Sequence, residues 1–203
     1  MDFGWSQPQV ELYDRILAFA RSQLNGNVAE RMERHEFGAK EWRACGDFGL
    51  LGLSVPESFG GQGLDMLTTA LAVESFGRGA EDAGLVFSAS AHLFACTMPI
   101  AENASTVLKH GYLPGLATGK LIGANAITEA GAGSDVFALA TRAVRDGDHY
   151  VLDGVKSYVT NGPVADVGDI NEGLEALGHD GLRSVTAAYA GGEQGREGAI
   201  LAD

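Results

Sequence analysis

The hydrophobic pattern of this chain changes its period near Gly119, and this change constrains the fold more than any other feature of the sequence. Upstream, apolar residues recur at the three- and four-residue spacing of helices, which predicts helices over residues 10–24 and 30–46. Downstream, short alternating stretches are punctuated by glycine, a pattern typical of antiparallel strands. We therefore expect an α+β fold, with an all-helical N-terminal domain over residues 1–118 followed by a partial antiparallel β-domain.

Three further helices are expected in the N-terminal domain, over residues 65–77, 84–100 and 104–110. The second of these is nearly all apolar. It is short for a membrane span, which needs about 20 apolar residues, and it contains His92 and Pro99. We interpret it as a core helix that packs on several sides, and we expect no membrane contact.

The expected β-domain covers residues 119–167. Residues 122–128 form its first predicted strand. Strand patterns cover 140–145 and 149–152, and Gly147-Asp148 separates them. The second pattern runs on to Asp153-Gly154, and an Asp-Gly pair flanked by strand patterns predicts a β-hairpin. A further strand is expected to start at 158–160.

Both patterns fade after Val167. Residues 168–203 are rich in glycine, show little alternation and contain one modest helical stretch at 170–177. We therefore treat 168–203 as a divergent, glycine-rich tail. Two origins stay open for it: an altered or truncated reading frame, which the abrupt change favours slightly, and a naturally divergent end.

Two short segments carry the residues of a candidate ligand site. Residues 126–135 place three small residues, 131–133, between the hydroxyl of Thr128 and a Ser-Asp turn. Small residues let a backbone approach a ligand closely, and a run of exposed N–H groups binds a phosphate or a carbonyl oxygen. Further along, 154–162 reads as a strand-like stretch with an aromatic residue and a threonine on one side. The order and spacing of the two segments predict a shared site.

This pair of segments resembles the flavin-binding segments of the acyl-CoA dehydrogenase family, in which Thr-Glu-x-x-Ala-Gly-Ser-Asp is followed by Gly-x-Lys-x-aromatic-x-Thr-Asn. Residues 49–65 resemble the N-terminal helical domain of the family, and 112–119 resemble the approach to its β-domain. The resemblance covers residues 9–166, whereas family members are considerably longer than this chain. The C-terminal helical domain of the family has no counterpart in the sequence.

The resemblance implies FAD as the cofactor, because no side chain accepts the hydride that leaves an acyl thioester. It places seven residues at the flavin: Asn125, Ile127, Thr128, Gly133, Ser134, Tyr158 and Thr160. Ser134 would also contact the acyl thioester. The hydroxyls of Thr128 and Thr160 suit the polar edge of the flavin ring, although β-propensity alone also explains a threonine in a strand.

Two positions depart from the family pattern. Ala130 stands where many members have proline, which makes that turn less rigid. Tyr158 stands where a tryptophan usually packs on the flavin. A tyrosine ring still stacks, with less area, so we expect weaker flavin binding rather than none.

No catalytic base can be assigned from the sequence, and the catalytic residues stay unknown. Family members take their base from the C-terminal helical domain. Glu129 and Asp135 lie inside the first motif, but a carboxylate in a turn more often caps backbone N–H groups. Lys156 is expected to be structural or solvated. The five histidines share no spacing, so we expect each to be a surface or satisfied core residue, and we expect no metal site.

The charge balance limits the partners of the protein. With 27 acidic and 14 basic residues the net charge is −13, which argues against general binding of nucleic acid or of anionic membranes. It does not exclude a local positive pocket for a CoA thioester. Cys45 and Cys96 have neither metal-type nor disulfide-type spacing, and the N-terminus shows no secretory signal, so we expect a cytoplasmic protein.

Two functions follow from the resemblance. The first is an FAD-dependent dehydrogenase that desaturates the α,β bond of an acyl thioester on CoA or on a carrier protein, with an electron-accepting flavoprotein as a further partner. The second is a truncated, catalytically silent relative that acts as a subunit or interaction module. Apolar faces left uncovered by the absent domain favour a homo- or hetero-oligomer.

Overall fold

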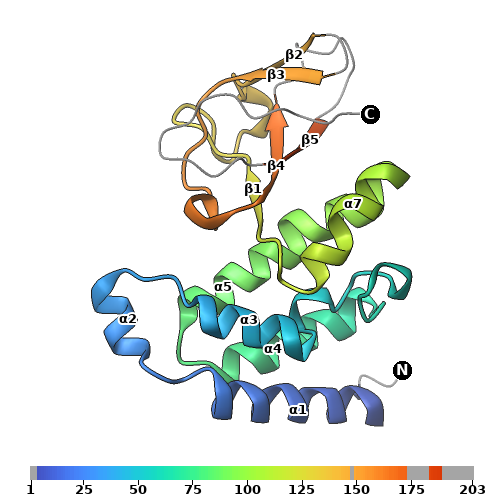
Figure 1. Ribbon diagram of the computed structural model, residues 1–203, viewed down its shortest axis with the longest axis vertical. Coiled ribbons are helices and arrows are strands. Elements are labelled where there is room, and N and C mark those ends of the chain that lie inside the picture. The colour runs from blue at the N-terminus through green and yellow to red at the C-terminus, as the bar shows by residue number, and fades with distance from the viewer. Residues whose placement is uncertain (1–3, 147–148, 173–182, 189–203) are drawn as a thin grey trace.

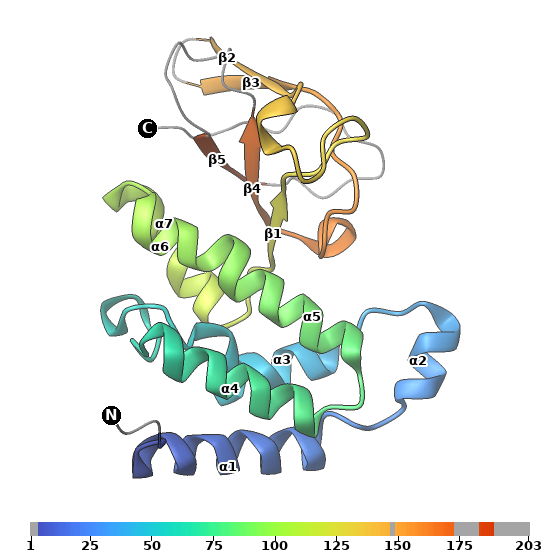
Figure 2. The same cartoon turned by 180° about the vertical axis from the view of Figure 1, so that it is seen from behind.

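The structure, a computed structural model, describes residues 4–146, 149–172 and 183–188. Figures 1 and 2 show the helices gathered at one end of the molecule and the strands at the other, with α7 and β1 at the junction. The α+β architecture expected from the sequence is confirmed. The helical domain contains α1 (Gln7–Gln23), α2 (Val28–Arg34), α3 (Ala39–Phe48), α4 (Met66–Gly79), α5 (Ala83–Ser90), α6 (Met98–Asn103), α7 (Thr106–Ala117) and the short helical turns η1 (Leu50–Gly52) and η2 (Glu57–Phe59).

The expected helices at 10–24 and 65–77 correspond to α1 and α4, which pack against each other. The single helix expected over 30–46 is wrong, because the structure breaks it into α2 and α3. His35 ends α2 with a left-handed φ of 54°, and the chain turns before Gly38 precedes α3. The last helix is also longer than expected, since α7 continues through Pro114 to Ala117.

The apolar run after Ala83 forms one continuous helical stretch of α5, a π-helical segment η3 (Ala91–Thr97) and α6. By length and composition alone, these 21 residues would also suit a membrane span. In this fold Leu85 and Leu93 belong to one cluster of buried residues, and Ile100 belongs to a second. The stretch therefore acts as the central core helix, as its sequence predicts.

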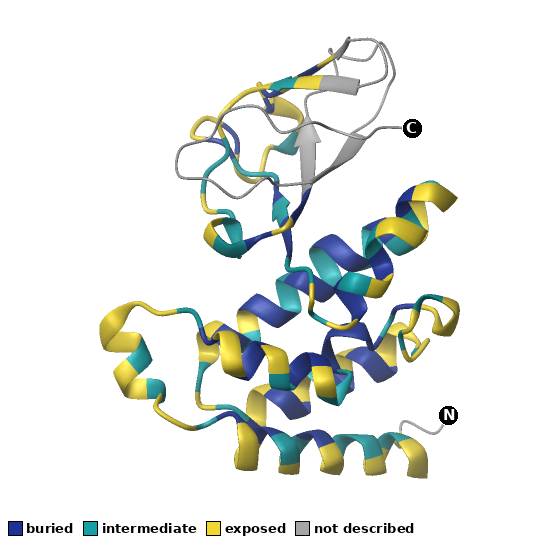
Figure 3. Ribbon diagram, in the orientation of Figure 1, coloured by how far each residue is buried: buried dark blue, intermediate teal, exposed yellow. Residues whose placement is uncertain are grey.

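Buried side chains concentrate between the helices, and exposed ones cover the outer faces (Figure 3). Ile16 of α1, Phe76 of α4 and Leu50 of η1 are fully buried in the first cluster. Asp65 and Asp82 cap the first turns of α4 and α5, where their carboxylates accept hydrogen bonds of 2.9 Å from backbone N–H groups. The helical domain thus combines an apolar core with satisfied helix ends.

The described strands form two groups. A three-stranded sheet has the order β1 (Gly123–Ala126), β4 (Val167–Glu172) and β5 (Arg183–Ala188). The strands expected at 140–145 and 149–152 correspond to β2 (Arg142–Asp146) and β3 (His149–Asp153), which pair with each other, so the hairpin expected at Asp153-Gly154 is misplaced. β1 and β4 are parallel, whereas β4 and β5 are antiparallel. The sheet is therefore mixed, because the long connection from β1 to β4 carries the chain back to its starting edge. Two helical turns, η4 (Val136–Ala138) and η5 (Gly162–Val164), lie within this connection.

Two strand expectations are wrong. Residues 158–160 do not start a strand: Tyr158 has a left-handed φ of 57°, and the chain turns into η5. Strand structure also does not end at Val167, because β4 begins there and runs to Glu172. The helical stretch expected at 170–177 is strand over its first three residues, and its remainder lies outside the described residues.

Candidate functional site

The first motif forms an open loop that follows β1. Glu129 and Ala132 close a tight turn with two backbone hydrogen bonds, of 3.0 and 3.2 Å between N and O atoms. Gly131, Gly133 and Ser134 are exposed, and η4 follows directly. The loop therefore exposes its two glycines and Ser134 at the outside of the β-domain, whereas Ala132 between the glycines is buried.

Nothing in the described part of the chain requires glycine at two positions of this loop. A Cβ atom built on Gly131 or on Gly133 would meet no heavy atom within 4 Å, and neither residue has a left-handed φ. Larger side chains would therefore fit the protein itself. The open space beside these backbones suits a group from outside the chain that approaches closely, as the flavin interpretation requires.

The second motif runs alongside the first. The backbone N–H of Ser157 donates to the carbonyl oxygen of Thr128 over 2.8 Å, beyond the end of β1. At the start of β1, the side-chain amide of Asn161 donates to the carbonyl oxygen of Gly123 over 3.0 Å. Residues 157–161 thus lie antiparallel to residues 123–128. The two segments that the sequence predicted to share a site are neighbours in space.

The predicted flavin-contacting residues surround this junction. Asn125 lies in β1 and is half-buried, as are Ile127 and Thr128 just beyond it. Thr160 is half-buried in the turn before η5, whereas Tyr158 exposes 94% of its surface. An exposed aromatic ring in a left-handed backbone conformation has no packing role in the protein and is available to stack on a planar ligand.

Glu129 holds the two motifs together. Its carboxylate accepts hydrogen bonds from the Lys156 ammonium at 2.8 Å, from the backbone N–H of Ala140 at 2.7 Å, and from both the backbone N–H (3.0 Å) and the hydroxyl of Thr141. Lys156 also donates to the carbonyl oxygen of Ile127 over 3.0 Å. The expected roles are confirmed, because Glu129 caps backbone N–H groups and Lys156 is structural.

These contacts also set the protonation of Glu129. Desolvation of its carboxylate raises the pKa, but the hydrogen bonds from Lys156, Thr141 and Ala140 outweigh that effect and lower the pKa to about 2. The carboxylate is therefore ionised at neutral pH and its oxygens are occupied. A group in this state is a poor general base, since a base needs a pKa near the working pH.

Sequence reasoning missed two residues that shape the site, Ser88 and Thr141, and it gave Asn161 no role beyond its place in the second motif. Ser88 of α5 exchanges hydrogen bonds with Asn161: its hydroxyl donates to the amide oxygen, and its carbonyl accepts from the amide nitrogen over 3.1 Å. Thr141 binds Glu129 as described above. The Asn-Gly pair at 161–162 carried a usable signal, because asparagine tolerates the left-handed φ of 67° found there.

Among the described residues, no group of three or more His, Cys, Asp or Glu side chains is placed to hold a metal ion. His92, which the sequence leaves as a surface or core residue, is fully buried and hydrogen-bonded. Asp135 is exposed at the start of η4. A pocket of about 350 Å³ lies apart from the motifs, between α2 and α3 of the helical domain.

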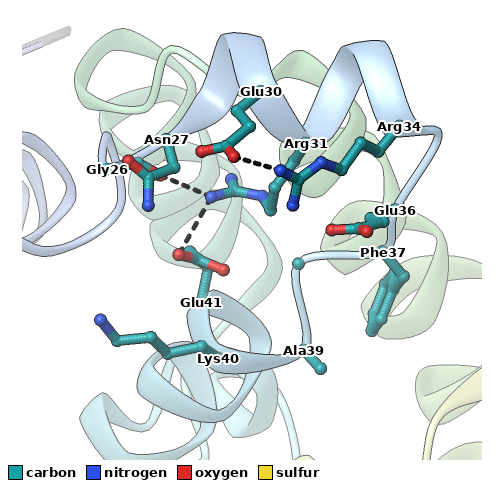
Figure 4. Close-up of a pocket in the computed structure, with 11 residues that line it drawn as sticks. Gly26, Asn27, Glu30, Arg31, Arg34, Glu36, Phe37, Ala39, Lys40 and Glu41 are labelled. Carbon is teal, nitrogen blue, oxygen red and sulfur yellow. Dashed lines mark hydrogen bonds and ion pairs between the residues drawn. The ribbon is translucent and has the colours of Figure 1, made fainter.

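Charged side chains line this pocket (Figure 4). Arg31 donates to the carbonyl oxygen of Gly26 over 2.6 Å and pairs with Glu41 at 3.0 Å and with Asp82 at 2.9 Å. Because Asp82 also caps α5, these bonds fasten α2 to two other helices. The described contacts give the pocket a structural role.

A helical domain is thus followed by a β-domain in which an open Gly-Ala-Gly loop lies beside a Thr-Asn turn, the arrangement that the sequence resemblance leads us to expect. Two family descriptions match the chain: "Acyl-CoA dehydrogenase, N-terminal domain" over residues 6–120 and "Acyl-CoA dehydrogenase, middle domain" over residues 124–171. The chain belongs to the acyl-CoA dehydrogenase family. The second match ends within β4, in agreement with the strand found there.

Named relatives agree with this assignment. L-prolyl-[peptidyl-carrier protein] dehydrogenase of Pseudomonas fluorescens is 48% identical over 170 residues, which cover 82% of this chain and 44% of the relative. Mitochondrial isovaleryl-CoA dehydrogenase of Bos taurus is 37% identical over 81% of this chain and 38% of the relative. The chain thus spans less than half the length of these curated relatives.

A solved structure gives the same result. The structure of PigA with FAD and proline superposes with a TM-score of 0.87 at 36% sequence identity, over 94% of this chain and 50% of that chain. FAD is the cofactor of the family to which this chain belongs, and the residues around the two motifs leave room for such a group.

Proposed function

We propose that this chain forms the FAD-binding and thioester-binding part of an acyl thioester dehydrogenase. The observation that carries the proposal is the antiparallel contact of residues 157–161 with residues 123–128, beside a loop whose glycines face open space. The residues that would hold FAD are those predicted from the sequence: Asn125, Ile127, Thr128, Gly133, Ser134, Tyr158 and Thr160. Ser134 is exposed and would also bind the thioester.

FAD, when bound, accepts the hydride that leaves the β-carbon of the acyl group, a reaction that protein side chains do not perform. The chain supplies binding and orientation. The hydroxyls of Thr128 and Thr160 are suited to the polar edge of the flavin, and the exposed ring of Tyr158 is suited to stack on it. Glu129 is excluded as the base for the α-proton, because hydrogen bonds occupy its carboxylate and its pKa is about 2.

The substrate we propose first is an aminoacyl thioester on a carrier protein. Two relatives named L-prolyl-[peptidyl-carrier protein] dehydrogenase, from Pseudomonas fluorescens and a Serratia strain, are 48% and 40% identical to this chain. An acyl-CoA is the alternative, supported by the isovaleryl-CoA relative. We further propose an electron-accepting flavoprotein as partner, an oligomeric assembly and a cytoplasmic location, the last supported by two buried thiols, Cys45 and Cys96.

Titration of the purified chain with FAD tests the proposal. We expect the flavin absorbance bands to shift on binding and the flavin to co-elute with the protein. Gly133→Val should abolish binding, because a branched side chain would fill the open space beside the loop. A chain that leaves the FAD spectrum unchanged at high protein concentration contradicts the proposed function.

Gly111→Val provides a matched control for this experiment. Gly111 is also exposed, also lacks a left-handed φ and also has no heavy atom within 4 Å of a built Cβ, but it lies in α7. We expect the Gly111 variant to bind FAD as the unsubstituted chain does. Equal loss of binding in both variants would show that the effect arises from stability and not from the loop.

A second candidate function, a catalytically silent subunit, is favoured by one observation: within the described residues, the one buried carboxylate at the motifs, Glu129, is unsuited to act as the base. Turnover distinguishes the two candidates. Reduction of a dye by the chain alone, with a prolyl carrier-protein thioester or an acyl-CoA, excludes the silent subunit. Turnover that requires a second polypeptide supports it.

A further inference from the structure

The π-helical segment η3 places one polar side chain inside the core. In a π-helix the backbone bonds from i to i+5, so side chains are rotated relative to those of the flanking α-helices, and such segments are often functional. Here the segment directs His92 between α7 and β1. His92 is fully buried, and its ring lies edge-on to Trp42 with the centroids 5.1 Å apart.

Both ring nitrogens of His92 are hydrogen-bonded to backbone groups. Nε2 lies 3.1 Å from the carbonyl oxygen of Leu116, which only accepts, so Nε2 carries the proton. Nδ1 accepts from the backbone N–H of Gly123 over 2.9 Å. The neutral imidazole therefore joins the last turn of α7 to the first residue of β1. Desolvation lowers the pKa of His92 to about 4, against the opposing effect of the Leu116 carbonyl, which keeps this neutral form at physiological pH.

Gly123 fits this position because it lacks a side chain. A Cβ atom built there would lie 2.7 Å from Sγ of Cys96 and 3.3 Å from Nδ1 of His92. The first of these distances is too short for two unbonded atoms, so a side chain at position 123 would clash with Cys96 of η3. The backbone at the start of β1 thus packs directly against η3 at Gly123.

The carbonyl oxygen of Gly123 is held from the same helical stretch. Asn161, which donates to this oxygen, is itself bound by Ser88 in α5, four residues before His92. Both backbone polar groups of Gly123 are therefore fixed, directly or through Asn161, to the α5–η3 helix. The two motif segments, which begin and end at this point, take their position from that helix.

We propose that His92 is a positioning residue for the flavin site: by anchoring the N–H of Gly123 to η3, it sets where β1 carries Thr128 relative to Thr160. This inference rests on the proposed function. An apolar residue in place of His92 would remove the acceptor of the Gly123 N–H inside the core, whereas the carbonyl of Leu116 would keep its hydrogen bond from the backbone N–H of Gly119. His92 touches neither the substrate nor the flavin residues; it acts through β1.

His92→Phe tests the role of the two hydrogen bonds, since it removes both and retains an aromatic ring beside Trp42. His92→Asn is the conservative variant, because its side-chain oxygen is placed to accept from Gly123. Ile16→Val is the control, since it weakens the core between α1 and α4, and Figure 1 shows α1 at the end of the helical domain that lies away from β1. For each variant we would measure amide exchange at Gly123, the dissociation constant for FAD and the free energy of unfolding.

We expect His92→Phe to accelerate exchange at Gly123 by at least about tenfold and to weaken FAD binding by about tenfold or more. His92→Asn should restore much of both, and Ile16→Val should change neither. Unchanged exchange and unchanged FAD affinity in His92→Phe would overturn the proposal. So would a loss of FAD affinity that Ile16→Val reproduces at equal stability, because His92 would then act through stability alone.

Two further results separate a failure of this inference from a failure of the proposed function or of folding. FAD binding by the unsubstituted chain tests the proposed function, and if it fails, amide exchange at Gly123 and Ser157 still decides whether His92 anchors both motif segments. If His92→Phe does not fold, Asn161→Gly replaces it, because glycine adopts the left-handed φ of 67° while the side-chain hydrogen bonds to the Gly123 carbonyl and to Ser88 are lost. That variant should weaken FAD binding while the Gly123 N–H stays protected, and unchanged affinity would overturn the proposal.

Discussion

The helical domain buries large apolar side chains, such as Phe76, Ile16 and Leu24, whereas the described part of the β-domain buries mainly alanine. Ala124, Ala126 and Ala132 are examples around the first motif. The motifs are instead positioned by polar contacts from Glu129, Lys156, Asn161 and His92, described above. The helical domain is therefore stabilised mainly by the burial of large apolar side chains, whereas hydrogen bonds set the shape of the site. Substitutions in the helical domain and in the site should therefore differ in how they affect the free energy of unfolding and the binding of FAD.

The largest effect is expected in the helical core. Phe76→Ala removes a fully buried ring and leaves a cavity, which should lower the free energy of unfolding by about 4 kcal/mol. Denaturant unfolding followed by far-UV circular dichroism measures this loss. Phe87→Ala is the control, because Phe87 is 65% exposed and its loss should change stability by less than about 0.5 kcal/mol. Similar losses in both variants would contradict the assigned core.

The next effect is expected at the buried ion pair. Glu129→Gln leaves the ammonium of Lys156, whose side chain is only 10% exposed, without its counter-charge, and should destabilise the β-domain by about 3 kcal/mol. Faster proteolysis between the two motifs, with the helical domain retained, measures the local loss. The double variant Glu129→Gln with Lys156→Met should recover part of the stability, since the uncompensated charge is gone. No recovery would mean that the hydrogen bonds to Thr141 and Ala140 dominate.

A pH effect of comparable or smaller size is expected from His92. Its pKa is about 4 in the folded chain, below the ordinary value of 6.5, so the unfolded state binds an extra proton between these values. Stability is therefore fully present above pH 6.5 and falls as the pH drops toward 4, by about 3 kcal/mol in total. Unfolding of the chain and of His92→Phe, measured across this window, isolates the contribution. A pH dependence that persists unchanged in the variant contradicts it.

The smallest effect on stability is expected at Tyr158. Tyr158→Ala removes a side chain that is 94% exposed, so the free energy of unfolding should change by less than about 0.5 kcal/mol. Loss of stacking should nevertheless weaken FAD binding by about tenfold. Parallel unfolding and FAD titrations separate the two quantities. A large loss of stability would show that the ring packs on the protein and not on a ligand.

The periodicity of the helical domain was sufficient to predict α1 and α4, because apolar residues at helical spacing must share a buried face. It failed at residues 35–38, since the left-handed conformation falls on His35 and not on a glycine, and a single glycine such as Gly38 is tolerated inside a helical pattern. Alternation predicted the strands β2 and β3, although the hairpin turn was expected after β3 and not before it. β4 was missed, because a strand that starts Val-Gly-Asp shows no clear pattern by itself.

The motif residues were found from the sequence, but their supports were not. Glu129 and Lys156 lie 27 positions apart, and Ser88 and Asn161 lie 73 apart, so no local pattern reveals either pair. Such contacts depend on which distant segments the tertiary fold brings together. The sequence around a polar residue in a core helix does not show which group that residue will bind. His92 shows this most clearly, since its sequence context is an apolar helix and its partner is a backbone amide.

Local sequence determined that this protein has a helical half and a strand half, and it singled out the two segments that we propose hold the cofactor, because side-chain periodicity and small-residue turns are properties of neighbouring positions. The tertiary structure alone decided that residues 157–161 run beside residues 123–128 and that η3 fixes both. The physical reason is that buried backbone N–H and carbonyl groups must find partners, and only the folded chain brings distant side chains within hydrogen-bonding distance of them.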